Sequence, residues 1–199
     1  MFFQNLPLDL DTFLFINQYL RCQLLDAAMP LFSSMGALLV LLAAALALAL
    51  LFGGKRQIVF FLVLLAGMGV TDFTSNLVKK QVNRIRPLNA VAETYYQDNG
   101  DWKQRPSDFK RTKEVGRSYP SAHSANSMCL AVLAMLIWPA LKRWPLVLPL
   151  LVGYSRIYLG KHYPTDVLAG WLYGVVTALA VWVIWQYGVR RFLPGMRRS

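Results

Sequence analysis

Residues 27–54 read AAMPLFSSMGALLVLLAAALALALLFGG, a run of 28 residues without one charged side chain. An α-helix needs roughly 20 apolar residues to cross the ~30 Å hydrocarbon core of a bilayer, so this run is long enough to do so. Two further runs are also long enough, 57–78 with Asp72 as its single charge and 167–189 with none. Helices of soluble domains rarely extend so far without charge. The sequence therefore predicts a polytopic membrane protein.

Dividing the rest of the chain around these runs gives about five spanning helices, expected near 29–53, 57–78, 121–139, 145–160 and 166–189. The fourth is short and contains Pro149, which is typical of a kinked or tilted helix. Residues 1–26 are amphipathic and too polar to span, which favours an interfacial helix. The expected fold class is an all-α polytopic membrane bundle, with residues 1–199 forming a single domain.

The charge and cysteine content exclude several other classes. A net charge of +11 could suit a nucleic-acid partner, but the basic residues lie in short clusters between apolar runs rather than on one solvated face. Cys22 and Cys129 lie in or beside predicted helices and suggest neither a disulfide framework nor a metal cluster. The first residues lack a basic leader followed by an apolar stretch and a small-residue cleavage site, so no removable signal peptide is expected.

Alternation of the helices predicts which segments share a side of the membrane. One side receives two short turns and the tail after the last helix, with eight Lys or Arg and no acid, at 55–56, 142–143 and 190–198. Positive charge in short loops marks the cytoplasmic side. The other side receives residues 88–119, a polar stretch with six Lys or Arg and five Asp or Glu. This stretch is expected to form an extracytoplasmic loop or cap over a site.

The same non-cytoplasmic face collects the residues that could do chemistry. Both histidines of the chain are predicted to lie there, with a carboxylate four residues after the second one. Ionisable groups near lipid are costly and are functional candidates by default. Cations attract an anion, and imidazoles offer a nucleophile and an acid, so the pattern indicates phosphate chemistry. The six side chains are Lys79, Arg86, His123, Arg156, His162 and Asp166.

Simpler interpretations exist for each of these residues. Lys79 and its basic neighbours could be interfacial anchors that snorkel. His123 could be a polar residue at a helix end, and His162 with Asp166 could form a structural hydrogen bond. Two histidines and one aspartate could also bind a metal, but the surrounding cations would repel a divalent ion. No metal is therefore expected.

Three motifs sharpen the prediction: Lys79-x6-Arg86-Pro87, Tyr119-Pro120-Ser121-Ala122-His123, and Ser155-Arg156-x5-His162-x3-Asp166. Together they resemble the signature motifs of the type 2 phosphatidic acid phosphatase family, which shares its site with vanadium-dependent haloperoxidases. The second motif departs once, because Ala122 replaces the usual glycine. Its amide can still donate, and whether its methyl group crowds the phosphate or tunes the pocket is open. Residues 1–78 match only in general helical character.

The resemblance implies a role for each residue. His162 would attack phosphorus to form a phosphohistidine, and Asp166 would hold its other ring N–H. His123 would protonate the leaving oxygen and later activate water. The remaining residues would bind phosphate: Lys79, Arg86 and Arg156 as cations, and Ser121 and Ala122 at a helix N-terminus. The reaction needs no cofactor.

A site at the membrane interface suits a membrane lipid substrate. The first expectation is a polyprenyl (undecaprenyl) diphosphate in a bacterial inner membrane, with the site facing the periplasm or outside. Alternatives are the 1-phosphate of lipid A, phosphatidylglycerophosphate or phosphatidate. A phosphotransferase would use the same residues. A transporter of anionic lipid or phosphate would also need buried cations, but not two histidines and an aspartate. The sequence leaves the lipid and the oligomeric state open.

Overall fold

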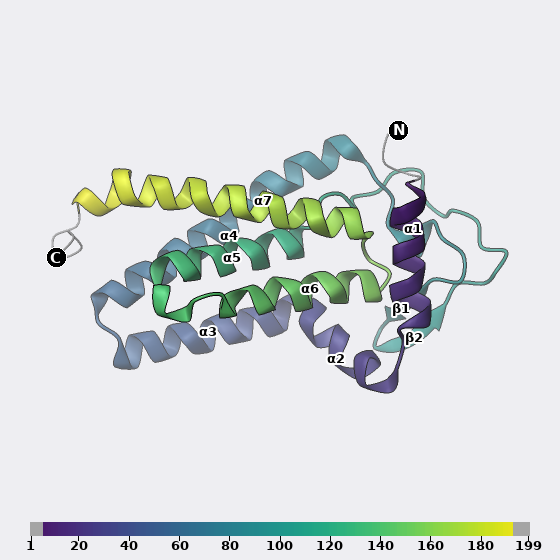
Figure 1. The fold of residues 1–199 in the computed structure, drawn as a ribbon, viewed down its shortest axis with the longest axis horizontal. Coiled ribbons are helices and arrows are strands. Elements are labelled where there is room, and N and C mark those ends of the chain that lie inside the picture. The colour runs from purple at the N-terminus through teal and green to yellow at the C-terminus, as the bar shows by residue number, and fades with distance from the viewer. Residues whose placement is uncertain (1–5, 193–199) are drawn as a thin grey trace.

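The computed structural model describes residues 6–192, and the chain is mostly helical. The helices that run along the long axis of the molecule form one bundle, in which α4 crosses behind α5 and α7 (Figure 1). They are α3 (Met35–Phe52), α4 (Lys55–Val82), α5 (Ala122–Ile137), α6 (Val147–Tyr158) and α7 (Pro164–Val183). A π-helical turn, Ile184–Val189, extends α7.

The N-terminal helices lie at one end of this bundle. Helix α1 (Pro7–Leu14) crosses that end at a steep angle to the long helices, and α2 (Gln23–Ser33) leads from it toward α3 (Figure 1). A π-helical turn, Phe15–Tyr19, follows α1. The crosswise orientation of α1 suits the interfacial helix expected for residues 1–26, of which residues 1–5 lie outside the described part.

The connections between helices are divided between the two ends of the bundle as the alternation of the helices predicts. The α3–α4 turn, the α5–α6 connection and the far end of α7 lie at one end (Figure 1). Helix α1, the α6–α7 junction and the 88–119 segment lie at the other. The 88–119 segment contains an antiparallel hairpin of β1 (Tyr95–Asp98) and β2 (Asp101–Gln104), so an all-α assignment is incomplete by this one element.

Within residues 6–192, two helical segments are long and apolar enough to cross a membrane, Lys55–Asn89 and Pro164–Phe192. Helices α5 and α6 have 16 and 12 residues, which is shorter than the roughly 20 that a perpendicular span needs. The expected total of about five spans therefore stays a prediction.

One expected helix is divided in two, and another contains its proline at an early position. The 29–53 span is broken at Ser34, whose ψ of 120° is extended, and this separates α2 from α3. Pro149 lies in the first turn of α6, where a missing N–H removes no helical hydrogen bond. The proline is thus compatible with the regular helix observed, and the kink expected there has no hydrogen-bonding cause.

Close packing of α5 against α7 fixes the relative positions of the segments that carry His123 and His162. A Cβ added at Gly174 would lie 2.3 Å from the Ala125 carbonyl oxygen, and one added at Gly170 would lie 2.6 Å from that of Ser121. Glycine is the residue that lets two helix backbones approach this closely. The N-terminal ends of both helices are therefore held together, and the two histidine-bearing segments begin there.

The hairpin is attached to the bundle through buried polar contacts. The fully buried Asn17 donates to the carbonyl oxygens of Tyr158 at 2.7 Å and Tyr95 at 2.9 Å, and its Oδ1 accepts from the Tyr95 amide. Arg21 lies over the ring of Trp102 at 4.0 Å and pairs with Asp26 at 2.5 Å. These contacts join the N-terminal segment, the hairpin and α6 at the histidine end of the bundle.

Candidate active site

His162 lies in the short turn between α6 and α7. The amides of Lys161 and His162 both donate to the Arg156 carbonyl oxygen, at 3.1 and 3.2 Å. Gly160 precedes them with φ +68°, and a Cβ there would lie 2.8 Å from the Tyr95 carbonyl oxygen. Only glycine suits that backbone and that space. The turn therefore places the His162 side chain, which is 1% exposed, inside the protein.

Asp166 is the third residue of α7 and bends back onto the helix start. Its Oδ2 accepts from the Tyr163 amide at 2.9 Å, as the acid of a capping box does. The same oxygen accepts from Ser118 Oγ at 2.5 Å, and Oδ1 accepts from Arg84 Nη1 at 2.7 Å. The carboxylate is fully buried and accepts three hydrogen bonds. His162 and Asp166 face one another through this capping turn, not across a turn of a continuous helix.

Ser118 lies between the two residues of this pair. His162 Nδ1 is 3.6 Å from Asp166 Oδ2, longer than a good hydrogen bond, and 3.4 Å from Ser118 Oγ. With Nδ1 directed at Ser118 and Asp166, Nε2 is the ring nitrogen left for chemistry. Gly116 allows this arrangement, because a Cβ there would lie 2.3 Å from the Arg84 carbonyl oxygen. Ser118 lies one residue before the Tyr119–His123 motif, so the motif did not identify it.

The electrostatic surroundings keep His162 neutral. Burial, together with the charges of Arg156 and Arg86, lowers the pKa of His162 to about 3, although contact with Asp166 opposes the shift. A histidine with this pKa carries a free lone pair on one ring nitrogen at pH 7. That is the protonation state a nucleophile requires.

Four cations surround the histidines. Lys79 is in the last turn of α4, Arg86 follows that helix, and Arg156 is in the last turn of α6. His123, at the start of α5, interacts electrostatically with His162 and with Lys79, Arg156 and Lys161. The six predicted side chains are thus brought together at one end of the bundle.

Lys161 was not anticipated, because it occupies an unspecified position of the third motif. Burial, followed by the charges of Arg156 and Arg86, lowers the pKa of Lys161 to about 8. Its position directly before His162 is the signal that could have identified it. A lysine with this pKa is still mostly protonated at pH 7 and adds to the positive potential.

Arg156 is oriented from α2. The side chain is 4% exposed, and Nη1 donates to the carbonyl oxygen of Ser33 at 3.3 Å and to Ser33 Oγ. Its Nε is buried without a hydrogen-bond partner among residues 6–192. Arg156 therefore retains donor capacity for an anion. Ser33 gave no signal in the sequence, because it falls inside a run read as a spanning helix.

Ser121 and Ala122 begin α5. Ser121 caps the helix: its Oγ accepts from the Ser124 amide at 3.4 Å and from Ser124 Oγ at 2.9 Å. The Ser121 amide donates to the Asp166 carbonyl oxygen at 2.9 Å and is therefore used within the fold. The first-turn amides of Ala122 and His123 have no partner within the helix and are the donors that an anion could use.

Residues 6–192 contain no group of three or more His, Cys, Asp or Glu side chains that could hold a metal ion. His162 and Asp166 are instead surrounded by donors and cations, which would repel a divalent ion.

Both cysteines are free, Cys22 exposed and Cys129 buried in the helical core.

The site can be placed in a family by comparison with known proteins. The family model of the PAP2 superfamily matches residues 60–190, which include all three motifs and more than half of the chain. The chain therefore belongs to the PAP2 superfamily, and the resemblance drawn from the motifs is confirmed. The roles of the individual residues stay predictions.

Relatives with different named substrates resemble this chain. An undecaprenyl-diphosphatase from Sulfolobus acidocaldarius is 31% identical over 86% of this chain and 75% of its own length. A lipid A 4′-phosphatase from Bacteroides thetaiotaomicron is 32% identical over 50% of this chain and 42% of its own length. Phosphatidylglycerophosphatase B from Bacillus subtilis is 32% identical over 46% of this chain and 48% of its own length. The last two alignments span less than half of those relatives.

Two solved structures share the fold. LpxE from Aquifex aeolicus superposes with a TM-score of 0.68 over 92% of this chain and 99% of its own, at 23% identity. A transmembrane PAP2 type phosphatidylglycerolphosphate phosphatase from Bacillus subtilis superposes with a TM-score of 0.63 over 95% of this chain and 91% of its own, at 22% identity. At these identities the likeness extends to the fold alone.

Proposed function

We propose that this protein is a multi-pass membrane phosphatase that hydrolyses the terminal phosphate of a lipid phosphate or diphosphate without a metal ion. One observation carries the proposal. A buried His162, which its low pKa keeps neutral at pH 7, has Ser118 and Asp166 at one ring nitrogen and interacts electrostatically with Arg156 and Arg86. A nucleophile within a positive site is what phosphoryl transfer requires.

The proposed reaction has two steps. His162 Nε2 attacks phosphorus, the bond from phosphorus to the leaving oxygen breaks, and His123 gives that oxygen a proton. The cations neutralise the charge spread over the equatorial oxygens, and Asp166 balances the charge that develops on the imidazole. His123 then takes a proton from water, which attacks the phosphohistidine and releases inorganic phosphate. In this second step the bond between phosphorus and Nε2 breaks, and His123 ends with a proton that comes from the water.

The preferred substrate is a polyprenyl diphosphate. The relative aligned over the largest share of this chain among those described above carries the name undecaprenyl-diphosphatase, which supports this choice. The relatives named for lipid A and phosphatidylglycerophosphate support monoester lipids as the alternative. The same residues would serve a phosphotransferase. A transporter of anionic lipids would need the cations but neither the His162–Asp166 pair nor His123.

A panel of lipid phosphates tests the proposal. The purified protein in detergent is expected to release phosphate, most rapidly from a polyprenyl diphosphate, because an enzyme needs no sealed membrane. Activity should survive EDTA and be inhibited by vanadate, which adopts a five-coordinate form like the transition state. Phosphate release would be measured by a molybdate assay. Loss of activity in EDTA with recovery on adding a divalent ion would contradict the metal-free mechanism.

The proposed orientation places the active site outside the cytoplasm of a bacterial inner membrane. It rests on the positive turns at 55–56 and 142–143, which lie at the bundle end opposite the site. In a chain carrying Cys22→Ser and Cys129→Ala, Ser107→Cys in the cap is expected to react with an impermeant maleimide in spheroplasts. Ser199→Cys should react only after lysis. The reverse labelling pattern would invert the topology.

A further inference from the structure

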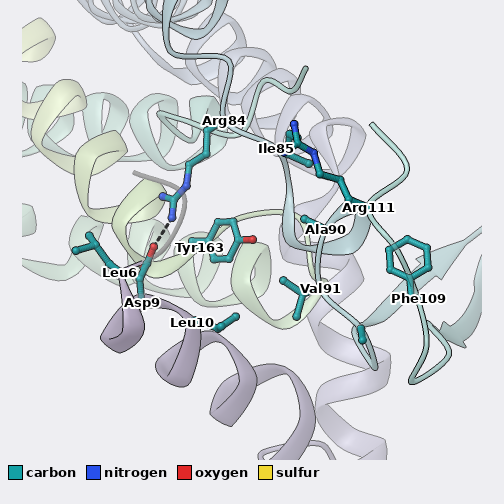
Figure 2. Close-up of a pocket in the computed structure, with 11 residues that line it drawn as sticks. Leu6, Asp9, Leu10, Arg84, Ile85, Ala90, Val91, Phe109, Arg111 and Tyr163 are labelled. Atoms are coloured by element: carbon teal, nitrogen blue, oxygen red, sulfur yellow. Dashed lines mark hydrogen bonds and ion pairs between the residues drawn. The ribbon is translucent and has the colours of Figure 1, made fainter. Parts of the chain in front are cut away.

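A second buried ion pair lies beside the catalytic carboxylate, and it joins Asp9, outside all three motifs, to Arg84, at an unspecified position of the first motif. Asp9 on α1 and Arg84 after α4 are 4% and 2% exposed, and Figure 2 shows them facing one another beside the ring of Tyr163. The two residues are 75 positions apart in the chain. Asp9 also lies outside the 60–190 region that matches the family model. A buried charge pair needs a physical reason to exist, because burying it is costly.

Direct contacts connect Asp9 to the catalytic Asp166. Arg84 Nη2 donates to Asp9 Oδ2 at 2.5 Å, and Arg84 Nη1 donates to Asp166 Oδ1 at 2.7 Å. Thr165 closes the network: its Oγ1 accepts from Arg84 Nη1 and donates to Asp9 Oδ2, each at 2.7 Å. The Thr165 amide donates to Asp9 Oδ1 at 2.9 Å. One guanidinium is therefore shared by two carboxylates.

Asp9 does not reach the reacting phosphate. Together with Arg84 it forms part of the wall of a cavity of about 440 Å³, and neither histidine lines that cavity. Leu6, Leu10 and Tyr163 line the same cavity (Figure 2). Any effect of Asp9 on the reaction is therefore indirect, through Thr165 or through Arg84, and of these two Arg84 donates directly to Asp166.

The balance of charge suggests what that effect is. The charges of Asp9 and Arg84 cancel, and the negative charge of Asp166 is then available to the imidazole of His162. When Nε2 bonds to phosphorus, the ring becomes positive, and Asp166 is its nearest counter-charge at 3.6 Å. Without the charge of Asp9, Arg84 would cancel Asp166 instead. The imidazolium would then form in a buried site with no net negative partner.

We propose that Asp9 is a positioning residue of the active site: by neutralising Arg84, it leaves Asp166 free to stabilise the positive charge that forms on His162 in the transition state. The N-terminal interfacial helix is then part of the catalytic apparatus. The inference rests on the proposed phosphohistidine mechanism and adds a residue that the motifs do not contain.

The test compares Asp9→Asn with Asp11→Asn, a matched change at an exposed position of the same helix. Asp9→Asn is expected to lower kcat about 10- to 100-fold, since the interaction that it weakens is made in the transition state. KM should change little. Direct titration in detergent should show vanadate binding weakened by a similar factor, because vanadate bonded to His162 reproduces the charged imidazole. Binding of inorganic phosphate should be unchanged or slightly tighter. Asp11→Asn should behave as wild type.

A double variant separates charge balance from loss of structure. Asp9→Asn leaves Arg84 with one carboxylate and could unfold the protein, whereas Asp9→Asn with Arg84→Gln restores the wild-type net charge around Asp166. The double variant is expected to recover part of the vanadate affinity and of kcat. A purely structural role predicts the opposite, with the double variant at least as impaired as the single one.

The outcomes distinguish this inference from the proposed function. If wild-type protein hydrolyses a lipid phosphate and Asp9→Asn retains both kcat and vanadate affinity, the role of Asp9 is refuted while the phosphatase stands. Equal weakening of vanadate and phosphate binding would also refute it, because the effect would then lie in the ground state. Failure of wild-type protein to bind vanadate at all would overturn both the mechanism and the inference.

Discussion

Asp166→Asn is expected to lower turnover by up to about 10⁴-fold, the loss found when an orienting carboxylate becomes an amide. The structure gives the reason. Ser118 donates to Asp166 and lies 3.4 Å from His162 Nδ1, so it can accept the ring N–H. An amide N–H in place of Oδ2 would donate to Ser118. Ser118 would then donate to Nδ1 and move the ring proton to Nε2, which could no longer attack phosphorus.

The fold should survive this substitution well enough to measure it. The Tyr163 amide, which donates to the same Oδ2, would lose this capping bond, whereas the Thr165 amide in the same first turn of α7 still donates to Asp9. Circular dichroism and elution from a sizing column would check the fold, and Asp108→Asn, at an exposed cap position, is the matched control. Turnover close to that of wild type would reduce the His162–Asp166 contact to a structural one.

The convergence of the motif residues could be predicted from the sequence, because it depends only on how many times the chain crosses the bundle. Lys79 and His123 belong to successive helices, and Arg156 and His162 follow two crossings later. Helix parity then brings all of them to one end, whatever the details of packing. The same argument placed the positive turns at the opposite end (Figure 1).

The residues that support the site could not be predicted in this way. Asp9 reaches Arg84 across 75 positions, and Ser33 reaches Arg156 across 123. Such contacts depend on how α1 and α2 dock, which no local pattern encodes. Arg84 looked like a snorkelling anchor because it follows an apolar run, yet it is buried between two carboxylates.

The hairpin in residues 88–119, by contrast, could have been predicted from the sequence. Asn99 and Gly100 both have positive φ, 51° and 96°, and join two paired strands. An Asn-Gly pair between such segments is the strongest short-range indication of a two-residue hairpin. The structure adds this hairpin to the loop or cap expected for residues 88–119.

His123→Ala is expected to separate diphosphate lipids from monoester lipids. A monoester expels an alkoxide, a poor leaving group that needs a proton in the transition state. A diphosphate expels a phosphate monoester whose own second pKa is about 6, so it can leave largely unassisted. General-acid help is worth about 10²- to 10⁴-fold, and that factor should be lost mainly with monoesters.

The second step makes the same variant diagnostic. Hydrolysis of the phosphohistidine still needs a base, so His123→Ala should accumulate an acid-labile phosphoenzyme when given a diphosphate lipid labelled with ³²P on the terminal phosphate. Rapid quenching would measure its formation and decay, with His162→Ala as the control that forms none. Equal slowing of the first step for both lipid types would show that His123 is not the acid. An active His162→Ala variant without an intermediate would place the nucleophile elsewhere, and the charge balance argued for Asp9 would then lose its basis as well.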